Sequence, residues 1–413
     1  MTYFVTLDDK KECVGIYSDG ELHFDAFPEN LTKTWKPSLS LDSISADKAE
    51  FAYLYANGKS LGELCPEELK PQWEKINKRM LAYQSSFIEA KVDTVENCIF
   101  DLIPLRYLTE LCYLKTEIIK HVFKTQEKPQ NYDFMRKLCV LLTEIEGQKI
   151  KLNLASLERN LHLKRGRDLA KDLRHGKKND FVSYDAFKTK TGRLSVKKGS
   201  FPILNLDKEF RTVIEPTNDW ILELDYNAAE LRTLLALAGK DQPVEDIHQW
   251  NSGILGVSRD EAKKSVISWL YGSKTSDIGE RLSEIYAREK ILSEYYDPVA
   301  QIVKTPFGRK IPTDDHHALN YLVQSTTADL VFDRMIALRG LLKDKKSFIK
   351  FCLHDSVVID LAQEDMISVT EIFNVFSNTK LGRFVSSLNA GKNFGELEKV
   401  ILTDGSGGST QVV

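Results

Sequence analysis

The chain has no long apolar run. No segment offers the roughly 18 consecutive apolar residues that a membrane-spanning helix needs. The first residues, MTYFVTLDDKKEC, have neither a basic start nor an apolar centre, so no secretory signal is expected. We therefore expect a cytoplasmic protein, or a viral protein that acts in the cytoplasm of its host, with no membrane partner.

Cysteine is sparse and shows no ligand pattern. The six cysteines lack the CxxC and Cys/His spacings of a structural zinc site, and most stand among apolar neighbours. This distribution predicts buried free thiols. The six are Cys13, Cys65, Cys98, Cys112, Cys139 and Cys352.

A large net charge is also missing. The 57 Lys and Arg residues nearly balance the 60 Asp and Glu residues, which leaves −3 and argues against a uniformly basic, nucleic-acid-binding surface. The distribution is uneven, however, because the segment from Arg159 to Lys198 holds 13 Lys and Arg against 4 Asp. A polyanion could bind there. A solvated helix face is an equally good interpretation of a basic run taken alone.

What is present is the composition of an ordinary globular protein with several modules: 413 residues, of which 42% are hydrophobic and 28% charged. Alternation around DDKK and SDG in residues 1–27 predicts a small β-meander. Helical periodicity dominates residues 60–175, with a break at KTQEKPQNYD. Strands and helices mix from about residue 180, and TDGSGGSTQVV predicts a flexible tail at residues 403–413.

An apolar run that ends in a carboxylate lies in the stretch Ile221–Gly239. WILELDY predicts a strand with Asp225 at its end, and NAAELRTLLALAG predicts a helix that ends at Gly239. An unpaired carboxylate at the inner end of a buried strand is costly, so a counter-charge is expected. Glu230, three residues after Asn227, also fits an N-cap arrangement, which would make it structural.

A second acid has a similar setting. SFIKFCLHDSVVIDLA consists of two apolar, β-rich runs around HD, which predicts a tight hairpin with His354 and Asp355 at its tip. Turn geometry alone could explain an Asp in that place. Taken together, Asp225 and Asp355 could hold two Mg²⁺ ions about 3.5–4 Å apart for phosphoryl transfer. The ions would then be the missing counter-charge.

One predicted helix face could bind a nucleoside triphosphate. In RDEAKKSVISWLYG, the side chains of Arg259, Lys263, Ile267 and Tyr271 recur every four residues and so share one face. Arg259 and Lys263 would meet phosphates near the helix start, where the dipole favours negative charge, and Tyr271 would meet the base and sugar. An ordinary amphipathic helix with exposed basic residues is the alternative.

These segments resemble motifs of one family. DYNAAELR, R-x3-K-x7-YG and HDS are similar, in order, to motifs A, B and C of the family A, polymerase I-like, DNA polymerases. Further segments resemble other parts of that family: TKTGRLS, DIH, TPFGRKIP, NYLVQSTTADL and GKNFGEL. The eight segments stand in the family's order, and the resemblance covers about residues 140–400.

The resemblance implies an α+β fold of the right-hand polymerase type, with an antiparallel-sheet palm, helical fingers and thumb, and a small N-terminal β-containing module. The implied domains are residues 1–95 as that module, 96–190 as a shortened helical thumb, 191–240 as palm with motif A, 241–304 as fingers with the motif B helix, 305–402 as palm with motif C, and 403–413 as tail.

The same resemblance implies residue roles. Asp225 and Asp355, with the backbone carbonyl of Tyr226, would bind two Mg²⁺ ions, for which Mn²⁺ can substitute, and Lys263 would complete the catalytic set as a general acid. Glu230 would exclude a ribose 2′-OH. The implied nucleotide-binding residues are Arg259, Lys263, Ile267, Tyr271, His248 and Glu230. The implied DNA-binding residues are Arg193, Asn205, Arg309, Asn320, Gln324 and His354.

Some positions depart from the family pattern. Ile267 stands where an aromatic residue is usual, and Ser356 stands where a Glu usually follows the motif C Asp. Asp8, Asp9 and Glu12 do not form the D-x-E of a 3′–5′ exonuclease, so we expect no proofreading. The N-terminal module would be a remnant of such a domain or an unrelated docking module.

The sequence thus predicts a template-directed DNA polymerase, a nucleotidyltransferase of DNA replication or repair that adds dNTPs to a primer 3′ end on primer-template DNA. Because the thumb is short, we expect low processivity unless a processivity or replisome protein helps. Two alternatives stay open: an RNA-synthesising or sugar-tolerant polymerase of the same architecture, and a catalytically inactive DNA-binding replication subunit.

Overall fold

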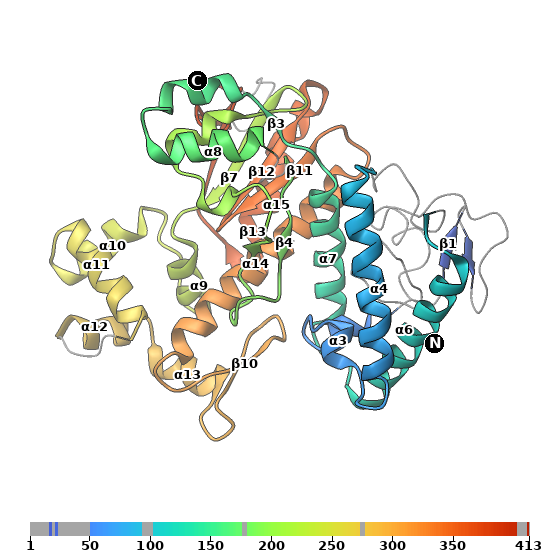
Figure 1. Ribbon diagram of the computed structural model, residues 1–413. Helices are drawn as coiled ribbons and strands as arrows, with labels where there is room; N and C mark the ends of the chain where they lie inside the picture. Colours follow the sequence, from blue (N-terminus) through green and yellow to red (C-terminus); the bar gives the residue numbers. More distant parts are fainter. Residues whose placement is uncertain are drawn as a thin grey trace. The chain divides into compact units, whose positions relative to one another are not determined.

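The computed structural model describes residues 16–18, 21–23, 50–92, 102–175, 180–272, 277–402 and 411–412 (Figure 1). The chain divides into two compact units, Met1–Glu144 and Ile145–Val413. No helix among the described residues is long and apolar enough to cross a lipid bilayer.

The first unit is helical around one apolar core. Helices α2, α3, α4 and α6 all contribute side chains to that core, and the Tyr107 hydroxyl donates to the Ile76 carbonyl at 2.9 Å to join α6 to α4. The elements are β1 Ile16–Ser18, β2 Glu21–His23, α2 Ala52–Tyr55, α3 Leu61–Leu64, α4 Lys70–Glu89, α6 Leu105–Thr125 and α7 Tyr132–Glu146.

Several predictions about this unit can be compared with it. The helix break falls between Thr125 and Tyr132, as the sequence predicts. Strands β1 and β2 form an antiparallel hairpin, and the rest of the predicted meander lies outside the described residues. The predicted boundary at residues 95 and 96 differs from the structure, because the helices on both sides of it share one core.

Three cysteines test the prediction of free thiols. Cys65, Cys139 and Cys352 are free and buried, which confirms the prediction for them. The side chains of Cys13, Cys98 and Cys112 lie outside the described part of the chain.

The second unit mixes helices and strands. Its helices are η1 Leu154–Asn160, α8 Lys164–Arg174, η2 Ile203–Asn205, η3 Lys208–Val213, α9 Ala229–Leu237, α10 Ile247–Leu255, α11 Arg259–Leu270, α12 Asp277–Ile285, α13 Arg288–Tyr295, α14 Ala318–Leu342, η4 Gln363–Ser368 and α15 Val369–Ser377. Its strands are β3 Lys151–Leu152, β4 Tyr184–Asp185, β5 Ser195–Val196, β6 Ile214–Glu215, β7 Trp220–Tyr226, β8 Tyr296–Asp297, β9 Ile302–Lys304, β10 Lys310–Pro312, β11 Phe348–Leu353, β12 Ser356–Leu361, β13 Asn378–Thr379, β14 Gly382–Arg383, β15 Ser386–Gly391, β16 Glu398–Ile401 and β17 Gln411–Val412.

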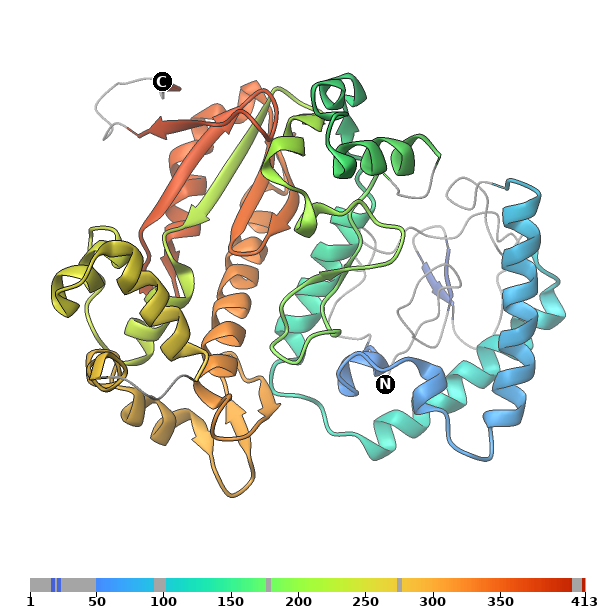
Figure 2. The same ribbon diagram turned by 60° about the vertical axis from the view of Figure 1, so that its left-hand side comes forward.

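An antiparallel sheet of six strands, in the order β11-β12-β7-β15-β16-β17, is the centre of this unit (Figure 2). The predicted strand WILELDY is β7, which lies between β12 and β15. The predicted hairpin is β11 and β12, with His354 and Asp355 in its turn. Both predictions are therefore confirmed, and so is the antiparallel sheet that the resemblance implies.

The two faces of β7 have different surroundings. Because side chains alternate along a strand, Leu222, Leu224 and Tyr226 share one face and Glu223 and Asp225 share the other. The apolar face is buried, and the Tyr226 ring stacks on Phe376 of α15 with centroids 4.1 Å apart. The acidic face is more open, so the chain places its two β7 acids where water and ligands can reach them.

A second core joins the helices that follow β7. Apolar residues of α9, α10, α11, α12 and α13 pack with the first half of α14, which includes Leu319, Leu322 and Val323. Helix α14 also contacts β11 and β12 of the sheet and α15 (Figures 1 and 2). It is thus the one long element shared by this core and the sheet in the described structure.

A buried ion pair stabilises the far end of the hairpin. Lys350 on β11 and Asp360 on β12 are almost completely buried, and their charged atoms lie 2.6 Å apart. Asp360 also accepts hydrogen bonds from the backbone N–H groups of Thr217 and Asn218, at 2.7 and 2.8 Å. These contacts hold the segment that enters β7 against β12.

We predict that Asp360→Asn destabilises the protein by about 3–5 kcal/mol, because it leaves the Lys350 charge buried without its partner. The free energy of unfolding in denaturant titrations checks this. Glu364→Gln, which removes the exposed Lys346–Glu364 pair, is the control and should change the stability only slightly. Equal small losses for the two variants would contradict the prediction.

Candidate active site

Two carboxylates meet at one end of the sheet. Ser356, the first residue of β12, pairs with Asp225 of β7, so Asp355 lies in the adjoining turn at the same end. Neighbouring strands are about 4.8 Å apart, which brings the two acids together. His354, with φ of +56°, makes the turn through a left-handed backbone. The sheet thus joins two acids that are far apart in the sequence.

Burial acts on both acids, and like charge acts on Asp225. Burial, followed by the negative charges of Asp355 and Glu223, raises the pKa of Asp225 to about 7. Burial also raises the pKa of Asp355, against the favourable effect of the Arg193 charge. The pair therefore favours any bound cation that offsets its charge.

A helix begins directly beside these acids. Ala228 adopts a left-handed backbone with φ of +51°, which turns the chain sharply from β7 into α9. The first backbone N–H of α9, at Ala229, acts on Asp355 and favours its charged form. The helix start therefore supplies part of the positive potential that Asp355 needs.

The N-cap interpretation of Asn227 and Glu230 is wrong. Ala228 is the N-cap residue, and no side chain caps α9. The Asn227 side chain instead accepts a hydrogen bond from Arg232 at 3.0 Å. Glu230 forms an ion pair with Arg193 instead of bonding to the backbone at the helix start.

Glu230 and Arg193 thus extend the acidic centre. Burial, and then the negative charge of Asp355, raises the pKa of Glu230, while the Arg193 charge opposes this shift. Arg193 also favours the charged form of Asp355. The predicted residues Arg193, Asp225, Glu230 and Asp355 are therefore brought together in one place.

Arg309 lies beneath the segment that carries Arg193. Its side chain is 9% exposed and pairs with the fully buried Asp329 of α14 at 2.6 Å. Gly192, with φ of +75°, packs so closely on the Arg309 guanidinium that a Cβ at this position would come within 2.5 Å of it. This burial disagrees with the prediction that Arg309 contacts DNA, and it gives Arg309 the role of supporting Gly192 and Arg193.

The predicted nucleotide-binding face is exposed on α11. Arg259, Lys263, Ile267 and Tyr271 are all exposed, with Ile267 at 44% and Tyr271 at 52%. On the opposite side Ala262, Val266 and Trp269 enter the core. The four residues therefore share one exposed face, as their spacing predicts, and this exposure fits both a nucleotide-binding face and an ordinary amphipathic helix.

Tyr271 connects this helix to α14. Gln324 donates to the Tyr271 hydroxyl at 3.2 Å and also hydrogen-bonds to the side chain of Asn320. Asn320 and Gln324 are both buried. These three predicted residues therefore form one hydrogen-bonded group at the junction of α11 and α14.

The other predicted residues occupy varied positions. The side chains of Asn205, in η2, and His354 are exposed. Burial lowers the pKa of His248, and the charges of Lys263 and Arg259 lower it further. The Tyr226 ring is buried and donates to the Phe376 carbonyl at 2.6 Å, so only its backbone could take part in metal binding.

Four residues of this region received no functional role from the sequence. Glu223 lies on the Asp225 face and was visible from the strand alternation. Arg232, which is completely buried, donates to Asn227 just after β7, and its charge interacts with that of Asp246. A polar residue at a helical core position was the available signal for Arg232.

The acid pair has the donor chemistry of a magnesium site. Mg²⁺ is typically bound through one or two carboxylates together with substrate phosphates, rather than by a complete protein cage. Asp225 and Asp355 supply such a pair, and the described residues contain no group of three or more His, Cys, Asp or Glu that could hold a metal. The residues therefore fit an ion that shares its coordination with a phosphate.

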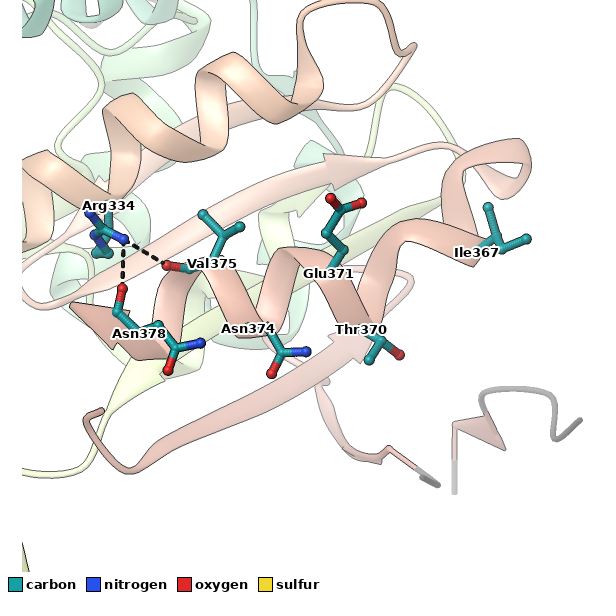
Figure 3. A pocket seen from close by; sticks show the side chains of 7 residues that line it. All are labelled: Arg334, Ile367, Thr370, Glu371, Asn374, Val375 and Asn378. Carbon is teal, nitrogen blue, oxygen red and sulfur yellow. Dashed lines mark hydrogen bonds between the residues drawn. The ribbon is translucent and has the colours of Figure 1, made fainter. Parts of the chain in front are cut away.

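A shallow groove of about 530 Å³ lies elsewhere on the second unit (Figure 3). It is lined by Arg334 and α15, and Arg334 donates to the carbonyls of Val375 and Asn378. None of the predicted site residues lines it. Its arginine is used to hold the end of α15, so the groove is not a second candidate for the chemistry.

The mixed helix and sheet architecture of this unit is shared with a polymerase domain of known structure. A solved structure with this fold is the POL domain of Pol1 from M. smegmatis in complex with a DNA primer-template and dNTP, with a TM-score of 0.52 and 13% identity over 70% of this chain and 75% of that one. The α+β fold class is confirmed.

A sequence relative agrees with the structural one. The chain is 25% identical over 185 residues to a DNA polymerase of Mycobacterium phage L5, which corresponds to 35% of this chain and 31% of the phage protein. The match thus spans less than a third of that relative. No protein-family model matches the chain. The resemblance to family A DNA polymerases is confirmed by these two similarities.

We predict that Asp225→Asn stabilises the metal-free protein at pH 8. Because the pKa of Asp225 is raised in the folded state, ionisation costs stability progressively as the pH rises from about 4 to about 7, and the full cost remains above that. After allowance for solvent screening we expect a gain of about 1–3 kcal/mol at pH 8 and none near pH 3.5.

Thermal unfolding across this pH range, without divalent metal, checks the prediction. Adding Mg²⁺ at pH 8 should stabilise the wild type and leave Asp225→Asn nearly unchanged. Asp360→Asn is the matched control, since it should destabilise at pH 8. A lower melting temperature for Asp225→Asn at pH 8 would contradict the proposed repulsion.

Proposed function

We propose that the protein is a template-directed DNA polymerase that adds dNTPs to the 3′ end of a primer. The observation that carries the proposal is the convergence of Asp225, Asp355, Glu230 and Arg193 at one end of the sheet. The fold shared with the M. smegmatis POL domain and the similarity to the phage polymerase support it.

Two Mg²⁺ ions would be held by Asp225, Asp355 and the carbonyl of Tyr226. When bound, they would activate the primer 3′-OH and stabilise the charge on the leaving pyrophosphate. The protein's own contribution is to fix the two carboxylates on adjacent strands before substrate arrives. Such preorganised charge needs no rearrangement during the reaction.

Helix α11 would bind the triphosphate. Arg259 and Lys263 lie on one exposed face, one turn apart, and would contact its phosphates. Lys263 would also donate a proton to the leaving pyrophosphate. His248 would contact the phosphates from α10, while Ile267 and Tyr271 would adjoin the sugar and base.

DNA would lie over the second unit along basic and polar groups. Helix α8 exposes Lys164, Arg165, Arg167, Lys171 and Arg174. Such charges release counterions from a duplex and make binding sensitive to salt. Arg193, Asn205, Asn320, Gln324 and His354 would contact the primer and template, and Arg309 would support Arg193 from below.

The proposal also assigns the domains of a right-hand polymerase to this chain. Residues 191–240 and 305–402 would be the palm, and 241–304 the fingers. The exonuclease question concerns Asp8, Asp9 and Glu12, which lie outside the described residues. The expected compartment is the cytoplasm, or the host cytoplasm for a viral protein.

Primer extension tests the proposal. We expect Asp225→Ala and Asp355→Ala each to lower the rate about a thousandfold or more, because each removes preorganised charge from the reacting centre. DNA affinity should stay within about tenfold. Glu371→Ala, at the separate groove, is the control and should keep full activity.

Two outcomes would redirect the assignment. Full activity of both Asp variants would place the chemistry elsewhere. Salt-sensitive DNA binding by a wild type that extends no primer would favour the inactive replication subunit.

The sugar preference is tested at Glu230. If its side chain excludes the 2′-OH, Glu230→Ala should raise the use of rNTPs relative to dNTPs by about tenfold or more. Glu230→Gln keeps the volume without the charge and should retain the wild-type preference. Equal use of rNTPs and dNTPs by the wild type would instead support the sugar-tolerant alternative.

A further inference from the structure

Asp246 holds the first cation of the α11 face. Arg259 donates to it twice, from Nε to Oδ1 and from Nη2 to Oδ2, both at 3.2 Å. The same carboxylate caps α10 by accepting from the Gln249 backbone N–H at 2.9 Å. Asp246 therefore joins the start of α10 to the start of α11.

The carboxylate is fixed from its other side as well. The fully buried Arg232 donates to the carbonyls of Pro243 and Glu245, at 2.8 and 3.1 Å, which holds the loop before α10. Arg232 also donates to the carbonyl and the side chain of Asn227, just after β7. The position of Asp246 is thus set relative to the end of the strand that carries Asp225.

Hydrogen bonds support a charged Asp246. Although partial burial opposes ionisation, the hydrogen bonds from Arg259, Gln249 and Asn227 lower the pKa of this carboxyl to about 2. It therefore carries a full negative charge at neutral pH.

Arg259 and Lys263, the two cations on the exposed face of α11, differ in their partners. Asp246 offsets the charge of Arg259, whereas Lys263 has no hydrogen-bond partner among the residues that the structure describes. A triphosphate that reaches Arg259 must either displace Asp246 or lie beside its negative charge. Both possibilities oppose binding.

On the basis of the proposed function, we propose that Asp246 competes with the triphosphate of the incoming nucleotide for Arg259 and so limits nucleotide affinity. Carboxylate oxygens on the guanidinium are exchanged for phosphate oxygens when the nucleotide binds. Asp246 thus limits affinity by acting through Arg259 and does not touch the reacting atoms.

Asp246→Asn separates this role from folding. Asn is as good an N-cap as Asp, so the bond to Gln249 is retained while the charge is lost. Because an exposed ion pair is weak, we expect Kd for dATP·Mg²⁺, measured by calorimetry without DNA, to fall only about two- to fivefold. KM for dATP in primer extension should fall equally, with kcat changed less than about twofold.

A double-mutant cycle with Arg259→Ala identifies the route of the effect. In that background, Asp246→Asn should give no gain in affinity. Glu364→Gln makes the same change of net charge at a remote ion pair and should leave Kd unchanged. Asp246→Ser, which also caps a helix, replaces Asp246→Asn if the latter does not fold.

Three results would overturn the proposal: weaker dATP binding by Asp246→Asn, an equal gain in the Arg259→Ala background, or no dATP binding by the wild type. The polymerase assignment fails separately. A wild type that binds dATP but extends no primer would refute that assignment, while the Kd values would still decide whether Asp246 and nucleotide compete.

Discussion

The sheet of the second unit holds two carboxylates together against their mutual repulsion. Backbone pairing of β7 with β12 puts Asp225 and Asp355 at one end of adjacent strands, partly shielded from water. The strands on both sides of β7 make this placement hard to relax. A bound cation would offset the two negative charges, and it could also coordinate a phosphate group.

The surrounding residues hold Asp225 and Asp355 in place. A left-handed Ala228 directs the start of α9 toward Asp355, and Arg193 shares its charge between Glu230 and Asp355. The buried pair Lys350–Asp360 stabilises the opposite end of the same hairpin, away from the acids. The stabilising ion pair and the acid pair thus lie at opposite ends of the β11–β12 hairpin.

Local sequence patterns predicted much of this arrangement. They could not predict the features that depend on contacts between different elements. Strand β7, the hairpin and the face of α11 follow from apolar alternation and helical spacing, so the sequence was sufficient for them. The partner of Arg309 is twenty residues away on another element, and that contact buries a residue that looked available for DNA. The side chain of Asn227 accepts from Arg232 instead of capping α9, and the loop after α9 completes the hydrogen bonds of that arginine through the carbonyls of Pro243 and Glu245.

Gly192 has a consequence for how motion can travel through the molecule. Its missing side chain lets the backbone rest on a guanidinium that Asp329 anchors inside α14. The same helix carries Gln324, which bonds to Tyr271 at the end of α11. Helix α14 therefore joins the segment that carries Arg193 to the end of α11, so the two are mechanically connected through one helix.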